Sequence, residues 1–301
     1  MDIVPYKSGL EEDLAIAYNE ATRLVLHCYP VFQADFAAAL QPVLSGESDF
    51  ERLEIQAVFV ATDDSAIRGY IHIGIQSIDE DNPRPIGIIR FFYYERGYRP
   101  ADQALLEAAE NYFRQHQAFA VEAFMQEYRY PFYCFAHSYL SNSLDQVEAM
   151  LGYNDYAKIG GEVFLDWLDY TPKTPDPIDL SFEIKLEWQQ GQGQLPGLRA
   201  QALQGDKSLG ECGNVSCGKF SRAAAVQDWL FTKWLGIQEE VQGQRLGCYL
   251  LQYALQAMHG VGYRHAAIST SWVNFRACQF YSNYGYRAVD WTYAWGRELT
   301  P

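Results

Sequence analysis

Two distant stretches of the chain repeat one order of features: a β-strand pattern, a short turn that contains glycine, and the start of an amphipathic helix. The first reads RPIGIIRFFYYERGYRPADQALLEAA and the second DWLFTKWLGIQEEVQGQRLGCYLL. At an offset of 146 residues, Gly97 falls on Gly243 and Leu105 falls on Leu251. A second match, MLGYN against NYGYR, follows at an offset of 133. Two matches in the same order predict a duplicated domain.

The length and one proline-rich segment predict where the two domains divide. The chain has 301 residues, which by length alone suggests about two domains. The segment DYTPKTPDPIDL, residues 169–180, contains three prolines and no apolar periodicity, as expected of a linker. We expect an N-terminal domain at 1–170, a linker at 171–180 and a C-terminal domain at 181–301.

Hydrophobic periodicity predicts the elements around both turns. In the first half these are two strands within 56–76 joined by an Asp-Asp-Ser-Ala turn, a strand at 84–94 and a helix from Pro100. In the second half they are a strand at 228–238, a helix with apolar residues from Leu250 to Met258 on one face, a strand at 265–272, and a short helix capped by Gly285. Proline suits the first turn of a helix, and glycine suits the position after its end.

Charge is distributed unevenly along the chain. The net charge is −15; residues 1–175 hold 12 Lys and Arg against 27 Asp and Glu, and residues 176–301 hold 11 of each. Because phosphate binding needs a basic face, we expect no nucleic-acid partner. The acidic half is interpreted either as a solvated surface or as a field that attracts a cationic substrate.

The sequence also limits the compartment and the metal chemistry. There is no run of about 18 apolar residues, so we expect no membrane span, and the N-terminus lacks the pattern of a signal peptide. Six scattered cysteines predict reduced thiols in a cytoplasmic protein. Cys212 and Cys217 are the closest pair, but no second Cys/His pair stands at ligand spacing, so we expect no metal.

The second glycine turn has the elements of an anion site. A strand that runs into a turn and then a helix presents free backbone N–H groups and the positive end of the helix dipole. The turn around Gly243 and Gly247 therefore predicts a phosphate site or, more simply, a tight connection. It is not a dinucleotide fingerprint, which needs a further glycine, nor a P-loop, because Cys248-Tyr249 stands where Lys-Ser/Thr is required.

The segment from Ile237 to Gly247, IQEEVQGQRLG, resembles the acyl-CoA-binding motif Q/R-x-x-G-x-G/A of the GNAT-type N-acyltransferases. That family's companion residues, an Asn, an Ala, a Tyr and a Gly-aromatic pair, are matched by Asn274, Ala277, Tyr281 and Gly285-Tyr286. One position departs from the motif, since Arg245 stands where glycine is usual. The resemblance covers residues 229–295 well and residues 56–165 weakly.

The resemblance implies both a fold and an activity. The fold is α+β, with two tandem GNAT-like domains, each a mixed, mostly antiparallel central sheet flanked by helices. The activity is direct transfer of an acyl group from acetyl-CoA, or another acyl-CoA, to the primary amine of a small or peptide acceptor, by a monomer or homodimer without a metal. The alternatives are a non-catalytic acyl-CoA-binding protein and a structural protein in which both turns are only helix starts.

The resemblance also implies which residues hold the cosubstrate. Backbone amides of the turn would bind the pyrophosphate, namely those of Gln242, Gly243, Gln244, Arg245, Leu246, Gly247 and Cys248. The strand edge at Leu235 and Ile237 would bond the pantetheine arm. Asn274 and Ala277 would contact the cosubstrate or fix the following helix.

Two residues are candidates for proton transfer. The family pattern places Tyr281 near the thioester sulfur, where a phenol with a pKa of about 10 could protonate the leaving thiolate; the alternative is core packing beside Phe280. Glu239 is a candidate base for the attacking amine. For Glu239 and Glu240 the alternative is a solvated charge at the turn, with water accepting the proton.

The first half lacks several of these groups. Pro100 has no N–H to donate, and Asp102 at the helix start would cap the free amides and repel a phosphate. The second sequence match puts Glu148 at the position of Tyr281. We therefore predict that the N-terminal domain is degenerate and that the C-terminal domain alone binds acyl-CoA.

Overall fold

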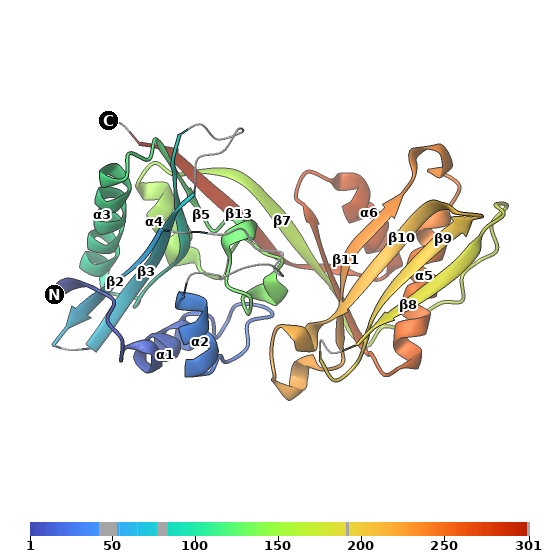
Figure 1. Cartoon of the computed structure of the whole chain (residues 1–301), viewed down its shortest axis with the longest axis horizontal. Coiled ribbons are helices and arrows are strands. Elements are labelled where there is room, and N and C mark those ends of the chain that lie inside the picture. Colours follow the sequence, from blue (N-terminus) through green and yellow to red (C-terminus); the bar gives the residue numbers. More distant parts are fainter. Residues whose placement is uncertain (42–52, 54, 65, 77–83, 191–192, 300–301) are drawn as a thin grey trace. The chain divides into compact units, whose positions relative to one another are not determined.

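The chain forms two compact units (Figure 1). The computed structural model describes residues 1–41, 53, 55–64, 66–76, 84–190 and 193–299. The first unit consists of Met1–Val163 with Asp290–Pro301, and the second of Phe164–Val289. Two long strands, β7 (Ala157–Trp167) and β13 (Arg287–Glu298), each contribute residues to both units.

These units have other bounds than the predicted domains. Residues 171–180, which contain no helix or strand, belong to the second unit, and the chain from Asp290 onward belongs to the first. The division into an N-terminal domain at 1–170, a linker at 171–180 and a C-terminal domain at 181–301 remains a prediction.

The first unit is built on a mostly antiparallel sheet with strand order β1-β2-β3-β4-β5-β13, and β6 also pairs with β13. The parallel pair is β4 with β5. Its elements are β1 (Asp2–Pro5), α1 (Glu11–Ala21), α2 (Gln33–Leu40), β2 (Ile55–Asp63), β3 (Ala66–Gln76), β4 (Ile86–Tyr94), α3 (Arg99–Gln115), β5 (Ala120–Ala123), β6 (Leu140–Ser141) and α4 (Asp145–Tyr153).

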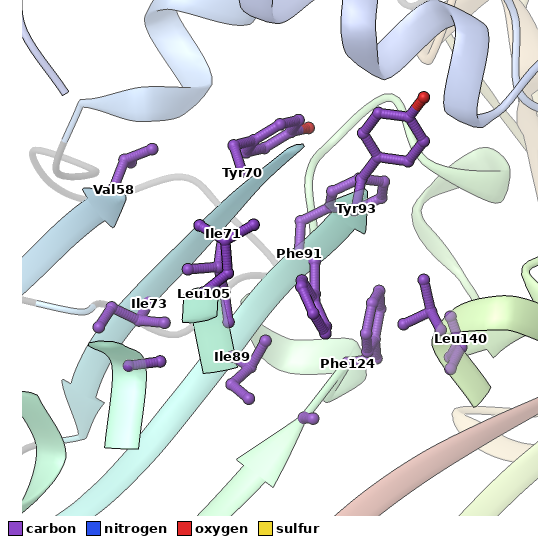
Figure 2. Close-up of a cluster of buried hydrophobic side chains, with 14 of the residues drawn as sticks. Val58, Tyr70, Ile71, Ile73, Ile89, Phe91, Tyr93, Leu105, Phe124 and Leu140 are labelled. Carbon is purple, nitrogen blue, oxygen red and sulfur yellow. The ribbon is translucent and has the colours of Figure 1, made fainter. Parts of the chain in front are cut away.

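Aromatic and branched side chains fill the core of this unit. Every residue of β4, IGIIRFFYY, is buried, as expected of a strand covered on both faces. Figure 2 shows part of this core, where Phe91 lies beside Phe124 and above Ile89. From α3, Leu105 reaches the sheet. Each such side chain contributes about 1.5–3 kcal/mol by leaving water.

The second unit repeats the plan with fewer elements. Its strand order is β7-β12-β11-β10-β9-β8, with β11 and β12 parallel and β8 to β11 antiparallel. Helix α5 packs on β9, β10 and β11. The elements after β7 are β8 (Glu183–Gln189), β9 (Gly197–Gln204), β10 (Lys207–Ser216), β11 (Trp229–Ile237), α5 (Leu246–Gly260), β12 (His265–Ser271) and α6 (Phe275–Tyr284).

A close helix–sheet contact occurs in the same form in both units. A Cβ on Gly69 of β3 would lie 3.0 Å from a methyl group of Leu105 in α3, and one on Gly210 of β10 would lie 3.3 Å from a methyl group of Leu250 in α5. Glycine at these positions lets the helix approach the sheet. The repeated contact supports duplication.

A β-bulge also recurs. The register of β3 with β4 shifts so that Arg90 is the extra residue, and the register of β10 with β11 shifts so that Lys233 is the extra residue. Bulges bend a strand and end its regular pairing, and they are common beside functional sites. Both units therefore bend the strand that leads into the glycine turn.

The structure confirms the predicted fold class and the predicted elements. The hairpin within 56–76 is β2 and β3, although Ser65 of its turn lies outside the described residues. The remaining predicted elements appear as β4, α3, β11, α5, β12 and α6. Gly285 follows α6 with a φ of 128°, the left-handed C-cap that was expected.

The unit bounds predict that residues 1–170 will not fold alone. Trp295 and Leu299, both buried in the first unit, would be missing, and the edge of β5 that pairs with β13 would be open. We expect no cooperative melting of the 1–170 fragment by circular dichroism, and recovery when a 287–299 peptide is added.

The same peptide with Trp295→Ala is the control, because truncating a buried Trp costs about 3–5 kcal/mol. It should restore little or no melting transition. A 1–170 fragment that melts cooperatively without the peptide would contradict the assignment of the C-terminal segment to the first unit.

Candidate functional site

The turn between β11 and α5 leaves backbone donors free. The first hydrogen bond of α5 runs from the N–H of Tyr249 to the carbonyl of Arg245, at 3.0 Å. The N–H groups of Leu246, Gly247 and Cys248 therefore have no partner inside the helix. Among the described residues no side chain caps this end. Three aligned donors at the positive end of a helix dipole form an anion site.

Left-handed backbone conformations give this turn its shape. Gly243 has a φ of 79° and Arg245, the N-cap, a φ of 67°. Glycine adopts this region freely, whereas an L side chain costs about 1–2 kcal/mol there. This requirement accounts for the glycine that is usual at the position of Arg245. The Arg245 guanidinium lies on the surface and pairs with Asp176 at 2.9 Å.

One expected donor is already used. The N–H of Gln242 donates to the carbonyl of Glu239 at 3.2 Å, closing the 3₁₀ turn Glu239–Val241. The Gln242 side chain in turn donates to the carbonyl of Ile237 at 3.0 Å. The prediction that the Gln242 amide binds pyrophosphate is therefore not supported, because this amide is bonded within the turn.

A pocket of about 650 Å³ opens beside this helix end, a size suited to a small molecule or cofactor arm. It is lined by most of the predicted site residues: Leu235, Ile237, Gln242, Gly243, Arg245, Leu246, Gly247, Cys248, Asn274, Ala277 and Tyr281. Predicted residues that do not line it are Gln244 and Glu239. Residues that the sequence reasoning missed are Val241, Arg276, Gln279, Phe280 and Asn283.

The pocket carries positive charge. Arg245 and Arg276 line it, and among the described lining residues there is no Asp or Glu. The free amides of α5 add the positive end of the helix dipole. The arrangement favours an anionic ligand such as a phosphate or pyrophosphate. Arg276 follows directly after the first residue of α6 and could have been found from its place within the companion motif.

The edge of β11 provides a second kind of binding group. The parallel pairing of β11 with β12 covers Trp229 to Phe231, and β11 continues to Ile237. Leu235 and Ile237 pair with β10 but lie beyond the last residue that pairs with β12, and both line the pocket. Unpaired peptide groups on a strand edge bond readily to an amide-bearing ligand.

Tyr281 combines a packed ring with an accessible hydroxyl. The side chain is 7% exposed, and its ring contacts those of Phe280 and Tyr286 at centroid distances of 5.1 and 5.7 Å. Its hydroxyl has no hydrogen-bond partner in the part of the chain that the structure describes, and it lines the pocket. Burial, and then the nearby Cys212, raise the pKa of Tyr281.

Asn274 holds the helix that carries Tyr281. Its side-chain oxygen accepts a hydrogen bond from the N–H of Ala277 at 3.1 Å, as an N-cap of α6. Of the two roles expected for Asn274, the structure shows the fixing of the helix. The cap sets the first turn of α6 and thereby the direction in which Tyr281 enters the pocket.

The candidate base does not join this group. Glu239 is exposed in the 3₁₀ turn and does not line the pocket. The neighbouring Glu240 is exposed too and forms an ion pair with Lys207. Both positions match the alternative interpretation of solvated charges at a turn.

The corresponding helix start in the first unit has fewer free donors. Pro100 has no N–H, the N–H of Ala101 donates to Tyr98, and the N–H of Gln103 donates to the Asp102 carboxylate. Asp102 is 4% exposed, and burial raises its pKa. The pocket beside it measures about 380 Å³. An acid and few free donors make this helix start a poor anion site.

The buried faces of α3 and α5 show that the sequence offset of 146 residues between the two halves is one residue too large. Ala101, Leu105 and Phe113 correspond in burial to Leu246, Leu250 and Met258, each 145 residues later instead of 146. The core-facing side of the helix determines this register. It places Asp102 at the position of Gly247, the residue that must stay small beside an anion.

The offset of the second sequence match, MLGYN against NYGYR, needs a larger correction. The N–H of Tyr156 donates to Leu151 after α4, just as the N–H of Tyr286 donates to Tyr281 after α6. The first-unit counterpart of Tyr281 is therefore Leu151, and the prediction of Glu148 was wrong. Glu148 instead pairs with Lys158. Leucine has no proton to donate, so the first unit lacks a general acid at this position.

Several absences concern the described residues alone. Within them no group of three or more His, Cys, Asp or Glu is arranged to hold a metal, and no helix is both long and apolar enough to cross a membrane. The six cysteines are free thiols, with Cys212 and Cys217 both buried.

Comparison with known proteins identifies the fold. No protein-family model and no curated protein sequence matches the chain. Solved structures do match: a tandem GNAT protein from the clavulanic acid biosynthesis pathway (12% identity, TM-score 0.68, 100% of this chain and 99% of that one) and a GCN5-related N-acetyltransferase from Sphaerobacter thermophilus (12%, 0.62, 100% and 96%).

A third similar structure is the glucosamine N-acetyltransferase region of a fungal multi-domain beta-N-acetylglucosaminidase, at 13% identity and a TM-score of 0.69, with 98% of this chain and 38% of that chain covered. The two mixed α/β units of this chain match the fold of these structures. The chain has the tandem GNAT fold.

The pocket geometry predicts that a negative charge at Gly243 will weaken acetyl-CoA binding. A carboxylate about 4 Å from a phosphate costs between about 1 and 4 kcal/mol, and about 1.4 kcal/mol corresponds to tenfold in affinity. We expect Gly243→Asp to raise the Kd for acetyl-CoA at least about tenfold by calorimetry.

Gly97→Asp in the first unit is the matched control. Both glycines have positive φ, at 94° and 79°, with no atom within 4 Å of an added Cβ, so both substitutions introduce the same strain. We expect less than about a twofold change for Gly97→Asp. Equal losses in the two variants, or a loss in Gly97→Asp alone, would contradict the placement of the site.

Proposed function

We propose that the chain is an acyl-CoA-dependent N-acyltransferase, with acetyl-CoA as the expected donor, that acts through the pocket of its second unit. One observation carries the proposal: a helix start with free amides and two arginines lies at one end of a pocket that receives the Tyr281 hydroxyl. The fold shared with GCN5-related acetyltransferases supports it.

The residues of the pocket fit coenzyme A. The amides of Leu246, Gly247 and Cys248, with Arg245 and Arg276 beside them, would hold the pyrophosphate. The open edge of β11 would bond the amides of the pantetheine arm. When bound, acyl-CoA supplies the thioester that an amine attacks. Asp176 would have to exchange its pairing with Arg245 for that of the phosphate.

Tyr281 is proposed as the general acid. Its raised pKa keeps the hydroxyl protonated at any pH at which the enzyme would work, so the side chain can donate a proton and cannot serve as a base. Donation to the departing sulfur avoids the release of a free thiolate into the pocket. The rings of Phe280 and Tyr286 and the N-cap at Asn274 hold this hydroxyl in place.

Water is proposed to accept the proton of the amine. Glu239 lies outside the pocket, and no acidic side chain is found among the described residues that line it. The acceptor must then arrive as the neutral amine. The rate should rise with pH as the amine loses its proton.

The acceptor class is the least specific part of the proposal. A primary amine on a small molecule or a peptide agrees with the fold, and the net charge of −15 favours a cationic acceptor by attraction. The same charge disfavours nucleic acid. We keep a monomer or a homodimer as the expected state.

A second candidate is a non-catalytic acyl-CoA-binding protein. The absence of a carboxylate base from the described lining residues favours it. The two candidates differ in one assay, since only the enzyme releases free thiol from acetyl-CoA in the presence of an amine panel.

The proposed role of Tyr281 predicts a loss in turnover and no loss in binding. General acids contribute about 10²–10⁴-fold to rate, so Tyr281→Phe should lower kcat about a hundredfold and change the Kd for acetyl-CoA less than about twofold. In the unsubstituted enzyme kcat should not fall on the alkaline side up to about pH 10, because burial raises the pKa of Tyr281.

Tyr284→Phe is the control on the same helix. Tyr284 donates to the carbonyl of Cys248 at 3.0 Å and does not line the pocket. It should keep most of the turnover. If Tyr281→Phe turns over as fast as the unsubstituted protein at several pH values, Tyr281 has no part in the proton transfer.

A further inference from the structure

A second pocket lies wholly within the first unit, between α1 and the end of β4. Its volume is about 540 Å³, which is in the range of small-molecule sites. The lining residues come from α1 and the turn after it, the start of β3, the end of β4 and the start of α4. We infer that this pocket binds a small organic ammonium compound with an apolar body.

Tyr93 brings a phenol hydroxyl into the lining of this pocket. The residue is 9% exposed, and it belongs to the core of the unit. Figure 2 shows its ring rising from β4 with the hydroxyl turned away from Phe91 and Phe124. The hydroxyl has no hydrogen-bond partner among the described residues, and Tyr93 lines the pocket. The ring is buried while the hydroxyl is open to the pocket, where a polar group of a ligand can bond it.

The neighbouring Tyr94 shows what a satisfied phenol looks like on the same strand. Successive side chains of a strand point to opposite faces, so Tyr94 faces away from this pocket. Its hydroxyl donates to the carbonyl of Gln146 at 3.1 Å. The contrast indicates that the open hydroxyl of Tyr93 is a feature of the pocket and not of the strand.

The charges around Tyr93 favour a cation. Three carboxylates line the pocket, those of Asp13, Glu20 and Glu95, against two guanidiniums, those of Arg23 and Arg96. After burial, Glu95 and Glu20 raise the pKa of Tyr93, and Arg96 opposes them by lowering it. They therefore lie within electrostatic reach of its hydroxyl.

Of the three carboxylates that line the pocket, two already form ion pairs. Glu20 pairs with Arg23 at 3.4 Å, Glu95 pairs with Arg68 at 2.6 Å, and Arg96 pairs with Asp145. In the residues that the structure describes, Asp13 has no ion pair. An ammonium group in this pocket would supply a counter-charge for Asp13 and a donor for the Tyr93 hydroxyl oxygen.

Apolar side chains at the rim define the rest of the ligand. Ile16 and Leu24 line the pocket and are 60% and 74% exposed. Ala17 and Ile67 add to the apolar wall. Large aliphatic side chains that are exposed to solvent beside charged groups favour a ligand whose apolar part covers them. The site differs from the acyl-CoA pocket in both charge and location, so it does not depend on the proposed activity.

Calorimetry with a charge series on one skeleton tests this inference. The probes are phenethylammonium, neutral 2-phenylethanol and anionic 3-phenylpropanoate, each titrated into the full chain without acetyl-CoA. We expect one equivalent of phenethylammonium to bind, at least tenfold more tightly than either of the others. Tyr93→Phe and Asp13→Asn should each weaken it at least about threefold.

Two variants serve as matched controls, and circular dichroism checks the fold of all four. Tyr112→Phe removes a phenol of α3 that does not line the pocket, and Glu12→Gln removes an α1 carboxylate that does not line it; both should leave the binding unchanged. Asp13 is exposed, so its variant tests the site even if Tyr93→Phe unfolds.

Three results would overturn the inference. The first is no heat with phenethylammonium at millimolar concentration, and the second is equal or tighter binding of the anion. The third is binding that neither Tyr93→Phe nor Asp13→Asn weakens, since the ammonium would then occupy another site, such as an acceptor site of the second unit.

Discussion

The free amides at the start of α5 are the constraint on which the functional account depends. They are free because the helix begins after a left-handed residue, Arg245, that supplies no capping side chain. A buried or capped helix start would have satisfied these donors from within the protein. The strand edge of β11, the positive charge of Arg276 and the Tyr281 hydroxyl are all arranged around that one end.

The two units show how one structural plan can keep or lose a site. Both bend the strand before the turn with a bulge, and both bring a leucine of the following helix against a glycine of the sheet. These features serve packing and are preserved. The helix start differs: in the first unit Pro100 and Asp102 leave few donors and add an acid. The loss concerns local hydrogen bonding, since the core that supports the turn is intact.

The sequence predicted the elements and most of the pocket because both depend on local patterns. The glycine turn and the companion residues from Asn274 to Tyr281 have fixed spacing, and the structure brings them together. The sequence offset between the two halves was wrong because a match of residue types does not show which face of a helix is buried. For this reason Glu148 was predicted as the counterpart of Tyr281, where the structure has Leu151. The bonded amide of Gln242, the exposure of Glu239 and the open hydroxyl of Tyr93 depend on three-dimensional packing, and no sequence pattern reveals them.

Hydrogen–deuterium exchange of the full chain with and without acetyl-CoA tests the central claim most directly. The account predicts that saturating acetyl-CoA slows exchange of the amides of Leu246, Gly247 and Cys248, while the amides at the start of α3 are unaffected. Slowed exchange at residues 96–103, or no change at the start of α5 under conditions in which acetyl-CoA is bound, would contradict it.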